Sequence, residues 1–253
     1  QLMEFIFTNL PELKLIYFTI IVIGIGGILR GFMGFGPALL TIPVLAFIYS
    51  PTEALVIHII MEIPSTLYLL PSAIKNSQKK EMTPMFIAMI LSIPLGMYLV
   101  VSLDPQIMRR IISIIVLFLV FLLARGWKLK TFIGLKTMTF SGFLGGFIQG
   151  AAGMGGPPIV AVLLSRDENP DISRGNVMLL MAGIVIFSIA SQSFYGLMSL
   201  KLITLGLSAS PIYMLTTYFG SRFYSSSGKY FFKKLALIFL AIIAITTLIA
   251  SFN

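Results

Sequence analysis

The sequence predicts an all-α, polytopic membrane protein made of two inverted repeats, each a broken re-entrant helix hairpin followed by three transmembrane helices. Of its 253 residues, 57% are hydrophobic and only 11% are charged, whereas soluble domains carry about 25% charged residues. The mean hydropathy is +0.99. At roughly 20 apolar residues per crossing, membrane helices and their short joints account for the chain. We therefore expect no separate soluble domain.

The composition also limits the chemistry. Lys and Arg number 18 against 9 Asp and Glu, but most cations lie in short hydrophilic joints between apolar runs, as topology-setting cations do. We therefore expect the lipid bilayer, and no nucleic acid, as the surrounding partner. The chain has no Cys and a single His, which excludes a disulfide, an iron–sulfur site and a multi-histidine metal cluster. No metal and no cofactor are expected.

Apolar runs bounded by charged residues, Pro or Gly define the predicted helices in chain order. Six runs are long crossings or nearly so: 53–73, 83–101, 109–125, 174–197, 201–220 and 234–252. The others form two pairs, each split by glycine: 13–31 with 38–49, and 137–150 with 157–165. Each pair is interpreted as a broken helix. The first run is too long for a signal-peptide core, so we expect it to be retained.

Glycines in the two broken regions repeat in one register. Gly26, Gly27, Gly31, Gly34 and Gly36 recur 119 positions later as Gly145, Gly146, Gly150, Gly153 and Gly155. The same offset carries Pro51 onto Pro170. The pattern predicts a duplication, with a first repeat over 1–130 and a second, inverted repeat over 131–253, together forming one membrane domain.

The distribution of cations predicts the topology. If both broken regions turn back, 13 Lys and Arg face one side of the membrane and 4 the other, with Arg30 set aside; if each crosses once, the count is 8 against 9. Because cytoplasmic loops carry an excess of cations, we expect hairpins that turn back. Three crossings per repeat then invert the second repeat and place both termini on the non-cytoplasmic side. The window 137–165 is too short for two full crossings, which predicts re-entrant hairpins.

The breaks predict a substrate site. Non-helical backbone at membrane depth is tolerated only where protein buries it or a water-filled cavity lines it, and matching breaks can meet near the midplane. Helices that restart at Pro37 and Pro157 would point their positive ends at the break, which favours a small anion. The substrate-binding residues predicted from the breaks are Gly31, Gly34, Phe35, Gly36, Pro37, Gly150, Gly153, Met154, Gly155, Gly156 and Pro157.

Two polar side chains flank the breaks at equivalent positions. Arg30 could hold a sulfonate or carboxylate with two hydrogen bonds, and its partner under the offset is Gln149. Arg30 could instead reach the membrane interface or pair with Glu53 or Glu62. Gly26 and Gly27 could serve close packing between helices instead of belonging to the break.

Three further polar residues are candidates within the long helices. His58 and Glu62 stand four residues apart on one helix face, so they could carry the coupling ion or simply satisfy each other. Asn176 follows Arg174 at the start of a later helix and is a weaker candidate for substrate binding. Phe32 and Phe35 lie in the first break and could gate it.

The motif Gly-Phe-Met-Gly-Phe-Gly-Pro at 31–37, followed by Pro43 and Pro51, and its counterpart Gln-Gly-Ala-Ala-Gly-Met-Gly-Gly-Pro-Pro at 149–158 resemble the TauE/SafE family of sulfite and organosulfonate transporters, over essentially the whole chain. The resemblance implies a carrier in the inner membrane of a bacterium or archaeon that moves sulfur-containing anions, typically outward, driven by an ion gradient. It also implies that the motif glycines and prolines form the substrate-facing breaks.

The functional prediction is therefore a secondary active transporter that exports sulfite or organosulfonates, coupled to H⁺ or Na⁺. An anion channel with re-entrant half-helices is the alternative, because such elements serve both classes. An enzyme is not expected: His58 has no serine-protease turn to pair with, and the zinc-protease motif His-Glu-x-x-His is absent.

Overall fold

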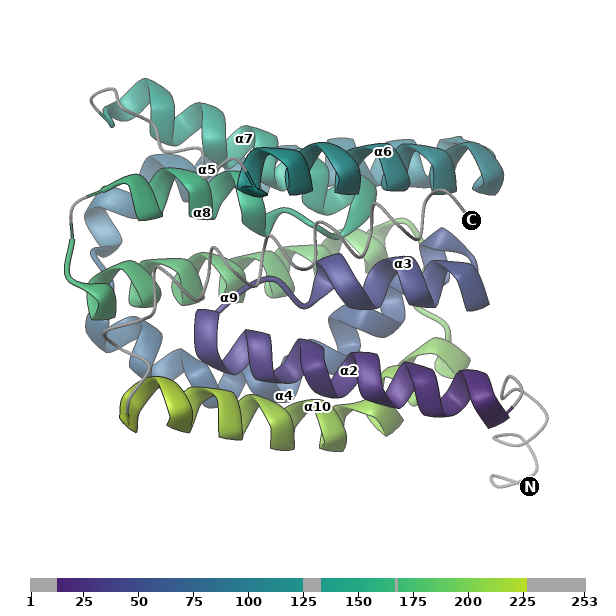
Figure 1. Cartoon of the computed structure of the whole chain (residues 1–253). Coiled ribbons are helices and arrows are strands. Elements are labelled where there is room, and N and C mark those ends of the chain that lie inside the picture. The colour runs from purple at the N-terminus through teal and green to yellow at the C-terminus, as the bar shows by residue number, and fades with distance from the viewer. Residues whose placement is uncertain (1–12, 125–132, 167, 227–253) are drawn as a thin grey trace.

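The computed structural model describes residues 13–124, 133–166 and 168–226, and every regular element in those ranges is an α-helix (Figure 1). The helices are α2 (Leu13–Met33), α3 (Ala38–Ile48), α4 (Pro51–Asn76), α5 (Lys79–Ser102), α6 (Pro105–Ala124), α7 (Leu135–Ala152), α8 (Gly156–Ser165), α9 (Pro170–Phe194) and α10 (Leu200–Ser226). In these ranges α2, α4, α5, α9 and α10 are long and apolar enough to cross a membrane. The predicted all-α membrane fold is confirmed.

The long helices α4, α5, α6, α9 and α10 coincide with predicted crossings to within a few residues at most ends. Their starts follow local capping chemistry. Ser50 and Glu53 form a reciprocal capping box ahead of α4, and the Asn169 side chain accepts from the Asp171 N–H at 2.9 Å ahead of α9. The predicted crossing at 234–252 and the repeat boundary at 130/131 lie outside the described residues.

Each glycine-rich region joins a long helix to a short one that turns back. In Figure 1, α2 begins at the right and α3 returns toward the right, whereas α7 begins at the left and α8 returns toward the left. Helices α3 and α8 have 11 and 10 residues, or roughly 15 Å at 1.5 Å per residue, about half of a bilayer core. Helix α2, with 21 residues, is long enough to cross by itself.

The most extensive helix contacts join α5 to α7 and α2 to α10, and α4 packs against α9. Each of these pairs takes one helix from residues before 130 and one from residues after it, so the two halves pack together through their long helices. Glycines allow the closest approaches. A Cβ on Gly31 would meet the α10 backbone at Thr217, and one on Gly150 would meet the α5 backbone at Ile93.

The α4–α5 and α8–α9 joints lie at the same end of the bundle (Figure 1). Arg166 forms an ion pair with Glu81 there, and the Asn176 side-chain oxygen Oδ1 accepts from the Gln78 N–H at 2.7 Å. Turned-back hairpins require this grouping of joints. The side on which each terminus lies concerns residues outside the described ranges and stays a prediction.

Candidate functional site

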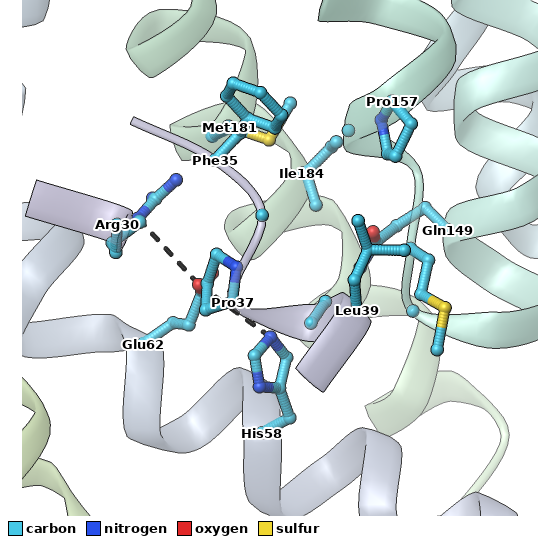
Figure 2. Close-up of a pocket in the computed structure, with 15 residues that line it drawn as sticks. Arg30, Phe35, Pro37, Leu39, His58, Glu62, Gln149, Pro157, Met181 and Ile184 are labelled. Atoms are coloured by element: carbon cyan, nitrogen blue, oxygen red, sulfur yellow. Dashed lines mark ion pairs between the residues drawn. The ribbon is translucent and has the colours of Figure 1, made fainter. Parts of the chain in front are cut away.

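Both breaks face one small cavity at the centre of the bundle, about 30 Å³ in volume. Figure 2 shows Arg30, His58 and Glu62 on one side and Gln149 and Pro157 on the other. The cavity is lined by Arg30, Phe35, Gly36, Pro37, Ala38, Leu39, His58, Glu62, Gln149, Gly153, Met154, Gly156, Pro157, Met181 and Ile184. Residues more than a hundred positions apart in the sequence therefore meet where the sequence predicts a substrate site.

The two breaks share their backbone geometry. The Gly34 N–H donates to the Arg30 carbonyl at 2.8 Å, and the Gly153 N–H donates to the Gln149 carbonyl at 2.8 Å, each donor and acceptor shifted by the same 119 positions. Gly34 has φ +83° and Gly153 has φ +69°, a left-handed conformation that glycine adopts without a Cβ penalty. These residues end the long helices and turn the chain toward the cavity.

Arg30 is buried, with 2% of its surface exposed, and its guanidinium is only partly engaged. It donates to the Gly34 carbonyl at 2.5 Å and to the Thr66 hydroxyl at 3.0 Å. Its Nε lies 3.8 Å from Glu62 Oε1 and makes no hydrogen bond. Arg30 therefore both pairs with Glu62 and lines the cavity. Glu53, the other carboxylate considered as its partner, instead caps α4.

His58 and Glu62 form a buried polar group on the face of α4 that lines the cavity. His58 Nε2 lies 3.7 Å from Glu62 Oε1, and the Tyr213 hydroxyl of α10 donates to the same oxygen at 2.7 Å. The Thr41 hydroxyl of α3 lies 2.8 Å from His58 Nδ1. Ionisable side chains at this depth are rare unless they pair or line a substrate or ion pathway; these two pair with each other and line the cavity.

Gln149 occupies the place opposite Arg30 and holds the second break. Its side-chain oxygen accepts from the Gly155 N–H at 3.0 Å, and its amide nitrogen donates to the Ser188 hydroxyl at 3.3 Å. Under the 119-residue offset, His58 and Glu62 correspond to Val177 and Met181. The charged side chains of the cavity wall therefore all come from α2 and α4.

Several predicted site residues lie away from the cavity. Gly31 and Gly150 lie within helices and serve close packing, as already described. Gly34 faces Met178, and Gly155 packs on the Gly145 carbonyl. The structure therefore places Gly31, Gly34, Gly150 and Gly155 behind the lining rather than in it.

Asn176 and Phe32 also point elsewhere. The Asn176 amide nitrogen donates to Gln78 of the α4–α5 joint at 3.2 Å and to Glu168 of the α8–α9 joint at 3.3 Å. Phe32 packs against the rings of Phe223 and Tyr224, so of the two break phenylalanines only Phe35 lines the cavity. Asn176 connects helix ends here and does not touch the central cavity.

Sequence reasoning missed Ala38, Leu39, Met181 and Ile184 of the lining, and the polar neighbours Thr41 and Tyr213. The repeat register could have found Met181, because it is the offset partner of Glu62. Tyr213 had no comparable signal, since its approach to Glu62 depends on how α10 packs against α4.

Arg174 has a different task from Arg30. Its guanidinium donates to the Phe32 and Gly31 carbonyls at 3.0 and 2.5 Å and stacks 4.1 Å from the centre of the Tyr224 ring. It thereby satisfies carbonyls at the end of α2, where a cation is favourable. Arg174 also lines a separate cavity of about 250 Å³ between α4, α9 and α10.

The central cavity is small. Its volume of about 30 Å³ exceeds the roughly 10–15 Å³ that one water needs but leaves little room for a multi-atom anion. A multi-atom anion would fit only in a wider cavity. Among the described residues, no group of three or more His, Cys, Asp or Glu side chains could hold a metal ion.

The family model described as sulfite exporter TauE/SafE matches residues 19–247, which is most of the chain. The match covers both breaks and every residue of the cavity lining. Comparisons with curated proteins and with solved structures returned no match.

Proposed function

We propose that this chain, which belongs to the sulfite exporter TauE/SafE family, is a secondary active transporter. It exports sulfite or organosulfonates across the inner membrane of a prokaryote. The family consists of membrane transporters rather than enzymes. Membership, together with five helices of membrane-spanning length among the described residues, makes the chain a multi-pass membrane transporter of sulfur-containing anions. We propose in addition where the anion binds, which ion is coupled to its transport and in which direction it moves.

The observation that carries the proposed binding site is the unpaired Nε of Arg30. This nitrogen belongs to a buried guanidinium in the cavity wall, and a buried donor without a partner costs roughly 1–3 kcal/mol. An anionic oxygen would satisfy it. The starts of α3 and α8 line the same cavity, and their positive ends favour the same charge.

Charge balance supports coupling to H⁺ through His58 and Glu62. With Arg30 charged, Glu62 ionised and His58 neutral, the cavity wall carries no net charge. One added proton on the His58–Glu62 pair gives the cavity wall a net charge of +1, which favours an anion. By linkage, the anion then favours the proton equally. We propose that the anion and one proton occupy the site together; coupling to Na⁺ is the alternative.

The electrical energetics support outward movement. A sulfite dianion that leaves with one proton carries a net charge of −1, and a membrane that is negative inside favours its exit by about 2.3 kcal/mol per 100 mV. For sulfite, the membrane potential then drives export as long as an opposing pH difference acting on the one proton costs less than this.

Alternating access by two inverted repeats, over 1–130 and 131–253, is proposed from three observations. The hairpins begin at opposite ends of the bundle, the break hydrogen bonds recur with one offset, and the helices pair across the two halves. Rocking of one group of helices against another would widen the central cavity toward one side at a time.

The first test is a thermal-shift screen of the purified protein with sulfite, sulfate, sulfoacetate, taurine, aryl sulfonates and matched carboxylates at two pH values. A ligand that binds only the folded state raises the Tm. We expect sulfite or sulfonates to stabilise the protein more than the matched carboxylates do, and more at acidic pH. Equal shifts with both classes would contradict the proposed substrate class.

Flux into proteoliposomes then separates a carrier from the alternative anion channel. A carrier predicts saturable flux of the stabilising anion, which a pH gradient can drive uphill. Flux that grows linearly with concentration and cannot be driven uphill would support the channel. Uphill flux driven by Na⁺ and not by pH would replace the proposed coupling ion.

A further inference from the structure

The Thr41 hydroxyl stands between the ionisable pair and the first break. It lies 2.8 Å from His58 Nδ1 and 3.0 Å from the carbonyl oxygen of Pro37. Thr41 and His58 are both buried, so no bulk water replaces a missing partner. Pro37 lines the central cavity and immediately precedes α3. The hydroxyl thus touches a proton-binding ring on one side and the wall of the anion site on the other.

A hydroxyl has one proton to donate, so Thr41 serves only one of these acceptors at a time. In neutral histidine one ring nitrogen donates and the other accepts. Nε2 faces Glu62 Oε1 at 3.7 Å, and a bare nitrogen there would oppose a carboxylate, so the hydrogen belongs on Nε2. Nδ1 then accepts from Thr41, and the Pro37 carbonyl keeps only its backbone donors, Leu40 and Thr41.

In imidazolium both nitrogens are donors. The added proton resides on Nδ1 and must be donated to the Thr41 oxygen, which forces the hydroxyl to turn and donate to Pro37. The ionisable groups around this ring are Glu62 on α4 itself, Arg30 of α2 through its pair with Glu62, and Tyr213 of α10 through the same carboxylate. Helix α3 contributes the neutral Thr41.

We infer that Thr41 is a positioning residue whose hydroxyl reports the protonation state of His58 to the break, by donating to His58 when the ring is neutral and to the Pro37 carbonyl when it is charged. In both patterns Nδ1 keeps the Thr41 hydroxyl as its hydrogen-bond partner, while Nε2 faces Glu62 Oε1 at 3.7 Å. The inference rests on the proposed coupling to H⁺, and it deepens that proposal by naming the group through which a proton acts on the anion site.

Because the chain contains a single histidine, nitrogen NMR of ¹⁵N-histidine-labelled protein in lipid bilayers reads this ring without ambiguity. We expect a bare Nδ1 and a protonated Nε2 at alkaline pH, and protonation of Nδ1 on acidification. Thr41→Val keeps the shape but leaves the Nδ1 proton of imidazolium without an acceptor. Half-protonation of the ring should therefore require a proton concentration about tenfold higher in this variant. Thr41→Ser should titrate as the wild type does.

Thr204→Val is the matched control, because the Thr204 hydroxyl also donates to a carbonyl four residues back but has no histidine beside it. A protonated Nδ1 in the neutral wild-type ring would overturn the inference, and so would a Thr41→Val ring that titrates normally. The wild-type spectrum decides the first point even if Thr41→Val does not fold. Wild-type flux that is indifferent to pH, with the expected titration of His58, would instead contradict the proposed coupling alone.

Discussion

The Nε of Arg30 and the Oε1 of Glu62 lie 3.8 Å apart in the interior, and their side chains are 2% and 8% exposed. Removing one partner of a buried ion pair leaves an uncompensated charge, which usually costs about 3–5 kcal/mol. The pair is nevertheless incomplete, because Arg30 Nε has no hydrogen-bond partner. The cavity wall therefore combines a neutralised charge with an unused donor.

Arg30→Gln should raise the Kd for sulfite at least tenfold, because charged hydrogen bonds to a buried anion are typically worth about 1.5–3 kcal/mol. Arg30→Lys should recover part of this loss, since it restores the charge without the planar donor set. Equilibrium binding to purified protein measures both. Lys201→Gln, which removes a cation at the start of α10, should bind as the wild type does. Unchanged affinity in Arg30→Gln would remove Arg30 from the proposed site.

Glu62→Gln should weaken the pH dependence of anion binding. In the wild type the cavity wall gains its net positive charge only when the His58–Glu62 pair takes a proton, so affinity falls as the pH rises. In the variant the wall keeps the charge of Arg30 without that proton, so affinity should persist at alkaline pH, while uphill flux driven by a pH gradient is lost. Tight binding with the wild-type pH profile would argue against this carboxylate as the coupling group.

Gly153→Ala and Gly196→Ala separate backbone strain from lack of space. Both glycines are left-handed, with φ +69° and φ +68°, so each alanine costs about 1–2 kcal/mol. A Cβ at Gly153 would also collide with Ile42 and Leu55, whereas Gly196 has nothing within 4 Å. Thermal unfolding should show the larger loss of Tm for Gly153→Ala. Equal losses would mean that the second break accommodates the added side chain with no steric cost beyond the backbone strain.

Arg174→Lys should lower stability while leaving the site intact. Lysine cannot reproduce the two hydrogen bonds to Gly31 and Phe32 together with the stacking on Tyr224. We expect a lower Tm, with the Kd for sulfite within about threefold of the wild type because Arg174 does not line the central cavity. A tenfold loss of affinity with unchanged Tm would move Arg174 into the substrate pathway.

Much of the candidate site could be predicted from the repeat register alone. The 119-residue register paired Arg30 with Gln149, and the structure places both in the wall of one cavity. The same register did not separate lining from packing glycines. Gly31 and Gly36 look alike in the motif, but only the path of α10 past Gly31 shows that it serves helix contact.

The amino-acid sequence by itself determined that the chain enters a membrane, where its helices start and where they break, because these depend on local hydropathy, capping and backbone preference. Only the tertiary structure decided which polar groups meet. Thr41 and Tyr213 reach His58 and Glu62 because α3 and α10 pack beside α4. Such encounters depend on the packing of helices that are distant in the chain, and a hydropathy pattern specifies which residues are buried without specifying their neighbours.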